Sequence, residues 1–262
     1  MNLPQLKEFL DRKVDEYNQP SFILNDPIIV PHRFVKRQDI EIAGFFTAIF
    51  SWGKRKTIIQ KSLALMELMD NSPYDFILQH EEADLQKMLG FKHRTFKDED
   101  LLYFIRFLSH HFRKYQSLED AFLPKAIKGI KIDPNAWAEA ALSQFYSGFF
   151  ALEDVPSRSY KHIASPAKHS TCKRLNMYLR WMVRRDKSGV DFGIWKKISP
   201  SALVCPVDVH VARVARHFGL LTRKPVDWLA ALELTSHLRT LDKEDPVKYD
   251  FALFGLGVAE HF

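Results

Sequence analysis

The sequence is poor in cysteine and contains no long apolar run. Only two cysteines, Cys172 and Cys205, occur among 262 residues, so cysteine alone cannot build a four-cysteine iron–sulfur cluster or zinc site. Because the chain also shows no signal peptide, so few cysteines indicate a reducing, cytoplasmic compartment. No window approaches 18 consecutive apolar residues, so we expect no membrane span and no membrane partner.

Several motifs of cofactor and metal sites are missing as well. The chain has no glycine-rich phosphate loop, no H-E-x-x-H pattern and no Cys/His pairs at metal-binding spacing, so we expect neither a cofactor nor a metal. It has no internal repeat and no low-complexity tract. Ten glycines are too few for a chain built on many glycine-dependent turns, and no stretch alternates convincingly as a strand does. We therefore predict an all-α fold.

What is present is an ordinary globular composition with a basic balance. The residues are 46% apolar and 27% charged, with a formal net charge of +6. A length of 262 residues suffices for one large domain or for two small ones that share a core. The positive charge fits an anionic partner such as nucleic acid, although many basic proteins bind none.

Apolar residues at helical spacing predict a series of helices along the chain. The helix over 171–185 has an apolar face and a basic face, the latter formed by Lys173, Arg174, Arg180, Arg184 and Arg185. Between the helices we predict an extended connector over 18–34, which holds three prolines, and loops over 91–100, 154–170 and 186–203. The other predicted helices cover residues 3–17, 38–52, 58–68, 73–80, 82–90, 101–112, 117–123, 135–150, 209–218, 226–241 and 246–262.

The most informative stretch is residues 204–221, VCPVDVHVARVARHFGLL. Here a loop that contains Cys205 and Pro206 leads to Asp208, which is a good N-cap for the amphipathic helix that follows. Gly219 closes this helix. The positive end of the helix dipole could also approach a phosphate. A structural N-cap alone is a common role for such an aspartate. The pattern of residues around Asp208 therefore decides whether it is only a cap or also a functional carboxylate.

That pattern resembles the Val-Asp-x-His-hydrophobic-x-Arg-Val segment of the helix-hairpin-helix (HhH-GPD) DNA glycosylases, the endonuclease III superfamily. The turn SWGKRKT (51–57) between two helices and the final PVKYDFALFGLG segment resemble the superfamily too. The resemblance implies one HhH-GPD-like unit over 1–262, with an active-site cleft between two helical subdomains. These subdomains are expected over 35–170 and over 171–262 plus the N-terminal helix region 1–34.

The resemblance implies that Asp208 is the catalytic carboxylate and that a lysine attacks the sugar. In the superfamily this lysine usually lies a little under twenty residues before the aspartate, near Lys196 and Lys197 here, but the Leu-Pro-Gly-Val-Gly hairpin of the family is missing. The archaeal 8-oxoguanine (GO) glycosylases have a longer gap, and Lys173 lies 35 residues before Asp208. Lys173 is therefore preferred, while Lys196 and Lys197 remain alternatives.

The same comparison implies further contacts. Asp250 and Phe254, four residues apart, match the carboxylate and the aromatic residue that hold the flipped purine, and Trp52 is expected in the same base pocket. Asp250 could equally be an early-helix charge and Phe254 a core residue, and the basic residues could be solvated. The expected DNA-binding residues are Ser51, Gly53, Lys54, Arg55, His210 and Arg213.

Together these features predict a monomeric base-excision-repair enzyme that binds double-stranded DNA containing a damaged base, in the cytoplasm at the nucleoid. A carboxylate stabilises the positive charge that develops at C1′ when the N-glycosidic bond breaks. An unprotonated lysine can form a Schiff base there and so permit AP-lyase cleavage. The branch resembled implies an oxidised purine, 8-oxoguanine. Two alternatives stay open: a monofunctional glycosylase in which Asp208 directs water, and an inactive DNA-binding module, which the missing glycine hairpin suggests.

Overall fold

The computed structural model describes residues 2–124, 133–258 and 260, which are mostly helical. This agrees with the all-α prediction. The chain divides into two compact units, which we call unit 1 (residues 1–24, 124–143 and 164–262) and unit 2 (residues 25–123 and 144–163). The expected subdomain limits lie at 34/35 and 170/171, whereas the two units divide at 24/25, 123/124, 143/144 and 163/164. Residues 124–143, expected in the same subdomain as most of unit 2, belong to unit 1.

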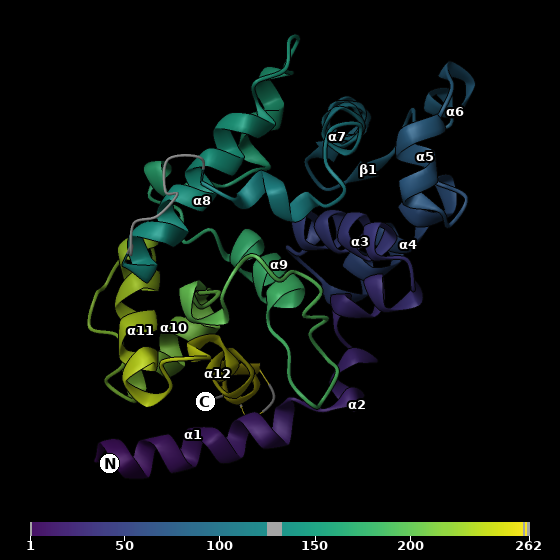
Figure 1. Cartoon of the computed structure of the whole chain (residues 1–262). Coiled ribbons are helices and arrows are strands. Elements are labelled where there is room, and N and C mark those ends of the chain that lie inside the picture. The colour runs from purple at the N-terminus through teal and green to yellow at the C-terminus, as the bar shows by residue number, and fades with distance from the viewer. Residues whose placement is uncertain (1, 125–132, 259, 261–262) are drawn as a thin grey trace. The chain divides into compact units, whose positions relative to one another are not determined.

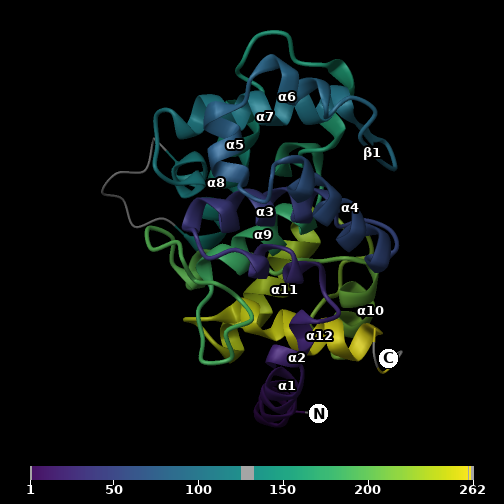
Figure 2. The ribbon, with the colours of Figure 1, turned by 90° about the vertical axis from the view of Figure 1, so that its right-hand side faces the viewer.

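Unit 1 contains the N-terminal helix and the C-terminal third of the chain (Figures 1 and 2). Its first helix, α1, covers the fifteen residues predicted, because Leu6, Leu10 and Val14 form one buried stripe and Asn2 caps the first turn. The elements of this unit are α1 (Leu3–Tyr17), α2 (Pro20–Ile23), the first part of α8 (Pro134–Phe149), the 3-10 turn η6 (Pro166–Lys168), α9 (Lys173–Val183), η7 (Pro200–Ala202), α10 (Val209–His217), α11 (Trp228–Leu241), η8 (Pro246–Lys248) and α12 (Tyr249–Val258).

Helix α12 lies against both α1 and α10, and two glycines allow this close packing. A β-carbon on Gly255 would overlap the Tyr17 ring of α1. A β-carbon on Gly257 would lie 3.3 Å from the Cβ and the carbonyl oxygen of His210 in α10. Because the two positions are two residues apart, they lie on nearly opposite faces of the helix. Helix α12 is therefore covered on both sides.

Unit 2 is built around α3, in which every residue from Asp39 to Phe50 is buried. Phe45 and Phe46 of this helix contact Phe104, and Phe104 in turn contacts Phe149 edge to face at 4.7 Å between ring centroids. The elements of this unit are η1 (Pro27–Ile29), η2 (Pro31–Arg33), α3 (Arg37–Phe50), α4 (Arg55–Leu68), α5 (Pro73–Gln79), α6 (Glu82–Gln86), β1 (Lys92–His93), β2 (Phe96–Lys97), α7 (Asp98–Phe112), η3 (Leu118–Phe122), the end of α8 and η5 (Ser157–Lys161).

Two local predictions were wrong. The extended connector predicted over 18–34 contains three short helical turns, because Pro20, Pro27 and Pro31 each begin a turn at the position where their fixed φ is favourable. The loop predicted over 91–100 contains the antiparallel hairpin of β1 and β2, in which two residue pairs face each other. Two pairs are too few to produce an alternating pattern in the sequence.

The last predicted helix, 246–262, is shorter than expected. It consists of the 3-10 turn η8 followed by α12, which ends at Val258. Residues 259, 261 and 262 of the prediction lie outside the described residues.

Candidate active site

Unit 1 brings Lys173 and Asp208 together although they lie 35 residues apart in the sequence. The Lys173 Nζ is 2.8 Å from Asp208 Oδ2. The side chains are 30% and 20% exposed, respectively, so the pair is shielded from water but can be reached from outside. An amine and a carboxylate in contact at a partly open position form the main candidate site of this chain.

The backbone fixes the direction of the Asp208 carboxylate. Its Oδ1 accepts hydrogen bonds from the backbone N–H groups of His210 (2.9 Å) and Val211 (3.0 Å) and so caps α10, as predicted. Because Oδ1 is occupied in this way, Oδ2 is the oxygen that faces Lys173. The segment before Asp208 is anchored as well, since residues 203–207 are buried.

Arg239 of α11 holds the loop that leads to this segment. Its Nε donates to the carbonyl oxygen of Ser201 at 3.2 Å, and its Nη2 donates to that of Leu203 at 3.1 Å. The backbone N–H of Cys205 donates to Thr235 Oγ1, also on α11, at 3.0 Å. Helix α11 therefore positions the chain just before the candidate carboxylate.

The surroundings keep Asp208 ionised. Burial by itself raises the pKa of this carboxyl, but the Lys173 ammonium and the backbone N–H groups at the start of α10 together lower the pKa below its usual value of 3.8. A negative charge near neutral pH is therefore supported by both a cation and a helix N-terminus.

Lys173 is the first residue of α9, so its position at the start of a helix agrees with the prediction. The residue before it, Cys172, has a φ of 52°, a left-handed conformation that is uncommon for a residue with a β-carbon. Thr171 supports the turn, because its carbonyl oxygen accepts a hydrogen bond from Asn176 Nδ2 at 3.0 Å. Local backbone strain thus lies directly beside the candidate nucleophile.

The two alternative lysines are placed differently. Lys196 and Lys197 are both exposed and follow the buried Trp195 in the segment before η7. The Lys196 Nζ donates to the carbonyl oxygen of Gly193, three residues earlier. Of the three candidate lysines, it is Lys173 whose amine contacts Asp208.

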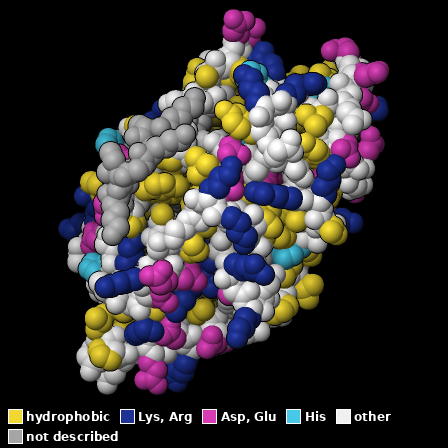
Figure 3. Space-filling view, in the orientation of Figure 1, with side chains coloured by type: hydrophobic (Ala, Val, Ile, Leu, Met, Phe, Trp, Pro, Cys, Tyr) yellow, Lys and Arg dark blue, Asp and Glu magenta, His cyan; other side chains and the backbone are white. Residues whose placement is uncertain are grey.

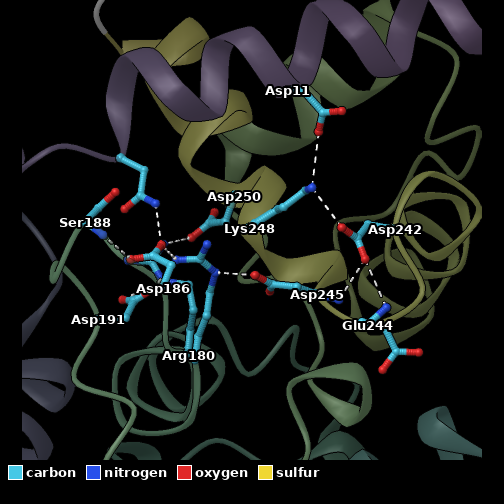
Figure 4. A network of polar contacts seen from close by, with 12 residues as sticks. Asp11, Arg180, Asp186, Ser188, Asp191, Asp242, Glu244, Asp245, Lys248 and Asp250 are labelled. Carbon is cyan, nitrogen blue, oxygen red and sulfur yellow. Dashed lines mark hydrogen bonds and ion pairs between the residues drawn. The ribbon is translucent and has the colours of Figure 1, made fainter.

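Asp250, expected in the base pocket, is buried in an ion pair with Arg180 of α9 (Figure 4). Burial raises the pKa of Asp250 to about 6, although the positive charges of Arg180 and Lys173 act in the opposite direction and the charge of Asp208 adds to the increase. The charges of Lys173 and Asp208 therefore shift the pKa of Asp250, but the carboxylate of Asp250 contacts the Arg180 guanidinium.

Arg180 belongs to a buried charge network that the sequence interpretation missed. Arg180 and Arg184 were assigned to the basic face of a helix, yet they are only 4% and 3% exposed. Arg180 Nε lies 3.3 Å from Asp191 Oδ1, and Arg184 Nη1 lies 3.1 Å from Asp191 Oδ2. Arg184 Nε also lies 2.8 Å from Asp245 Oδ2. Two arginines one helical turn apart, followed by aspartates in a loop, were the available signal.

The remaining expected residues of unit 1 lie around the start of α10 and in α12. His210 is exposed, and its backbone N–H donates to Asp208 Oδ1. Arg213 is also exposed, and its Nη2 donates to the carbonyl oxygen of Gly257 at 2.9 Å. Phe254 is half-buried, with its ring edge-on to Phe22 at 6.4 Å between centroids.

The other expected contact residues belong to unit 2, at the turn between α3 and α4. Ser51 is the C-cap residue that follows α3, and its Oγ donates to the carbonyl oxygen of Thr47. Trp52 is half-buried, while Gly53 and Lys54 are exposed and Gly53 has a φ of 103°. Arg55 is the first residue of α4.

Within the described ranges, no group of three or more His, Cys, Asp or Glu side chains is arranged to hold a metal ion. Among the helices that the structure describes, none is both long enough and apolar enough to cross a membrane.

The fold and the site define a mostly helical protein in which a lysine amine and a capped carboxylate meet at the starts of two helices. The chain belongs to DUF2400, a family of proteins of unknown function, whose family model matches residues 26–259. No curated protein and no solved structure matches the chain.

Proposed function

We propose that this protein is a DNA glycosylase with associated AP-lyase activity, in which Lys173 is the nucleophile and Asp208 the stabilising carboxylate. The observation that carries the proposal is the 2.8 Å contact between the Lys173 Nζ and Asp208 Oδ2, with the other carboxylate oxygen held by the backbone of α10. The motif around Asp208, which resembles the HhH-GPD glycosylases, supplies the reaction type.

The chemistry needs two groups at one carbon atom. The Lys173 amine, once it has lost its proton, attacks C1′ of the nucleotide, and the electrons of the C1′–N bond leave with the base, which takes up a proton. The Asp208 carboxylate stabilises the positive charge that develops at C1′. Opening of the sugar ring then gives a Schiff base, and loss of a C2′ proton expels the 3′-phosphate.

The resting ion pair sets a requirement for the first step. An ammonium that contacts a carboxylate must lose its proton before it can attack. Asp208 Oδ2, 2.8 Å away, is positioned to pass this proton on to the departing base, so that the carboxylate is charged again when positive charge develops at C1′. Because the carboxylate is capped on its other oxygen, it keeps its position while the proton moves.

The start of α10 supports binding of a phosphate backbone. Val209, His210 and Arg213 are exposed around the first turns of this helix, whose N-terminal end carries a partial positive charge. On the face drawn in Figure 3, Lys and Arg side chains are interspersed with acidic and apolar ones. The archaeal 8-oxoguanine branch that the Lys173–Asp208 spacing resembles favours an oxidised purine as the substrate.

The test is borohydride trapping on a DNA duplex that contains 8-oxoguanine. We expect the wild type to form a covalent protein–DNA adduct, Lys173→Ala to form none, and the matched control Lys196→Ala to form it as the wild type does. An unchanged adduct in Lys173→Ala, or no adduct and no base release by the wild type, would reject the proposal. Base release without an adduct or a strand break would instead identify a monofunctional enzyme in which Asp208 directs water.

A further inference from the structure

A second feature, in unit 2, has no part in the chemistry proposed above. Arg94 lies at the tip of the β1–β2 hairpin, and its guanidinium carbon is above the Trp52 ring, 4.5 Å from the ring centroid. This is a cation–π contact between the hairpin and the turn that follows α3. The resemblance did not point to Arg94, which lies in a segment predicted as a loop.

The backbone is built to allow this contact. Gly53 has a φ of 103°, and a β-carbon there would overlap the Arg94 Nη1. Arg94 itself has a φ of 55°, in the left-handed region that a residue with a side chain adopts uncommonly. Gly53 and Arg94 therefore both adopt backbone conformations that are unfavourable for most residues. Gly53 also leaves the space that the guanidinium occupies.

The hairpin is fixed on unit 2 at three points. His93 is buried and donates from Nε2 to the carbonyl oxygen of Phe50 at 2.9 Å. Phe96 is fully buried and contacts the Phe50 ring at 5.1 Å between centroids. Arg158 donates from Nη2 to the carbonyl oxygen of Thr95 at 2.8 Å. Arg94 is therefore presented by a rigid support rather than by a free loop.

The Arg94 side chain is available for a ligand. It is exposed, and none of the described carboxylates forms an ion pair with it. One side of the guanidinium faces the indole ring, so a ligand would stack on its other side. The Trp52 Nε1 is buried and has no hydrogen-bond acceptor among the described residues. The positive charge around the contact is increased by exposed lysines of the two adjoining segments, Lys54, Lys56, Lys92 and Lys97.

We propose that Arg94 and Trp52 form a stacking site for one unpaired nucleobase, which lies on the open side of the guanidinium while the surrounding lysines bind the phosphates. A guanidinium is planar and stacks on aromatic faces, which an ammonium cannot do. Stacking of this kind accepts any base that has left its partner, whereas a fully paired base offers no free face. The inference rests on the proposed function only for its ligand, DNA.

The test compares binding of two labelled duplexes by fluorescence anisotropy at fixed salt. One duplex is fully paired, and the other has an adenine opposite a tetrahydrofuran abasic analogue, which leaves that adenine without a partner and offers no base to excise. We expect the wild type to prefer the second duplex. In Arg94→Ala this preference falls about tenfold, the scale of one lost base-stacking contact, while Lys92→Ala weakens both duplexes equally.

Further variants separate stacking from charge and from loss of folding. Arg94→Lys keeps the charge and is expected not to restore the preference. Gly53→Ala, which displaces the guanidinium, should behave as Arg94→Ala does. Its matched control is Gly90→Ala, where φ is also positive (80°) but a β-carbon meets nothing within 4 Å. Full preference in Arg94→Lys, equal effects of Arg94→Ala and Lys92→Ala, or no preference in the wild type would each overturn the inference.

The two proposals fail separately. Base release by a wild type that shows no preference for the unpaired adenine would leave the glycosylase proposal standing and remove the stacking site. A clear preference that Arg94→Ala removes, without base release or adduct formation by the wild type, would do the reverse. The abasic-analogue duplex makes this separation possible, because its binding requires no reaction.

Discussion

Replacing Asp208 with asparagine or alanine separates the two roles of this side chain. Asparagine keeps an oxygen that can accept the N–H groups of His210 and Val211, and so it keeps the helix cap. It removes the negative charge that faces Lys173. Alanine removes both the charge and the cap. The two substitutions should therefore differ in their effect on stability but not in their effect on activity.

The expected costs follow from the contacts. The Lys173–Asp208 pair is 20–30% exposed, so its loss in Asp208→Asn should lower the free energy of unfolding by about 1 kcal/mol, the upper end for pairs near the surface. Loss of an N-cap costs about another 1 kcal/mol, so Asp208→Ala should lose about 2 kcal/mol. For a chain of this size each kcal/mol corresponds to a fall in Tm of about 2–4 °C.

The assays are urea unfolding at pH 7 followed by circular dichroism, and base release from the 8-oxoguanine duplex. We expect both variants to lose base release, because neither carries the charge that stabilises C1′. Asp227 is a matched control, since it caps α11 through the N–H of Ala230 at 3.0 Å and pairs with Arg223 at 2.6 Å, with its side chain 18% exposed. Asp227→Asn should keep base release at a similar cost in stability.

Two results would refute this reasoning. Base release at the wild-type rate by Asp208→Asn would show that the charge has no role at the sugar. Equal stability of Asp208→Asn and Asp208→Ala would show that the cap observed at α10 contributes nothing.

Two further predictions concern the frame of the site. Because the pKa of Asp250 is raised to about 6 in the folded chain, this group favours folding below about pH 4 and loses that contribution as the pH rises through 6. Between pH 4 and pH 7 the wild type should therefore lose about 3 kcal/mol of unfolding free energy relative to Asp250→Asn; urea titrations with no such divergence would contradict the pKa shift. Gly255→Ala should lower the unfolding free energy by about 1–3 kcal/mol through overlap with Tyr17, whereas the control Gly148→Ala, in open space, should raise it by up to about 1 kcal/mol. Equal thermal melts for the two alanine variants would argue against the packing described for α1 and α12.

Regular helices were predictable because local patterns determine them. The stripe of Leu6, Leu10 and Val14 defines α1 to the residue. Asp208 was predicted as a helix cap, and it is one. Such features depend on residues three or four positions apart, which a single sequence displays directly.

Features that depend on distant partners were not predictable in this way. Nothing in the helical pattern of residues 171–185 shows that Arg180 is buried against Asp250, 70 residues further on. The contact of Lys173 with Asp208 was expected only through the resemblance, since spacing alone left Lys196 and Lys197 open. The hairpin that carries Arg94 was missed because four paired residues give no periodic signal.

The packing of α12 between α1 and α10 also affects which residues a shortened protein must contain. The family match begins at residue 26, so it leaves out α1, whose Tyr17 covers Gly255. A shortened protein that begins at the start of the matched region would lack α1 and so expose one side of α12. On the other side of α12, Gly257 would remain packed against His210, which is two residues after Asp208. The first two dozen residues therefore belong in any expressed fragment meant to retain a native C-terminal half.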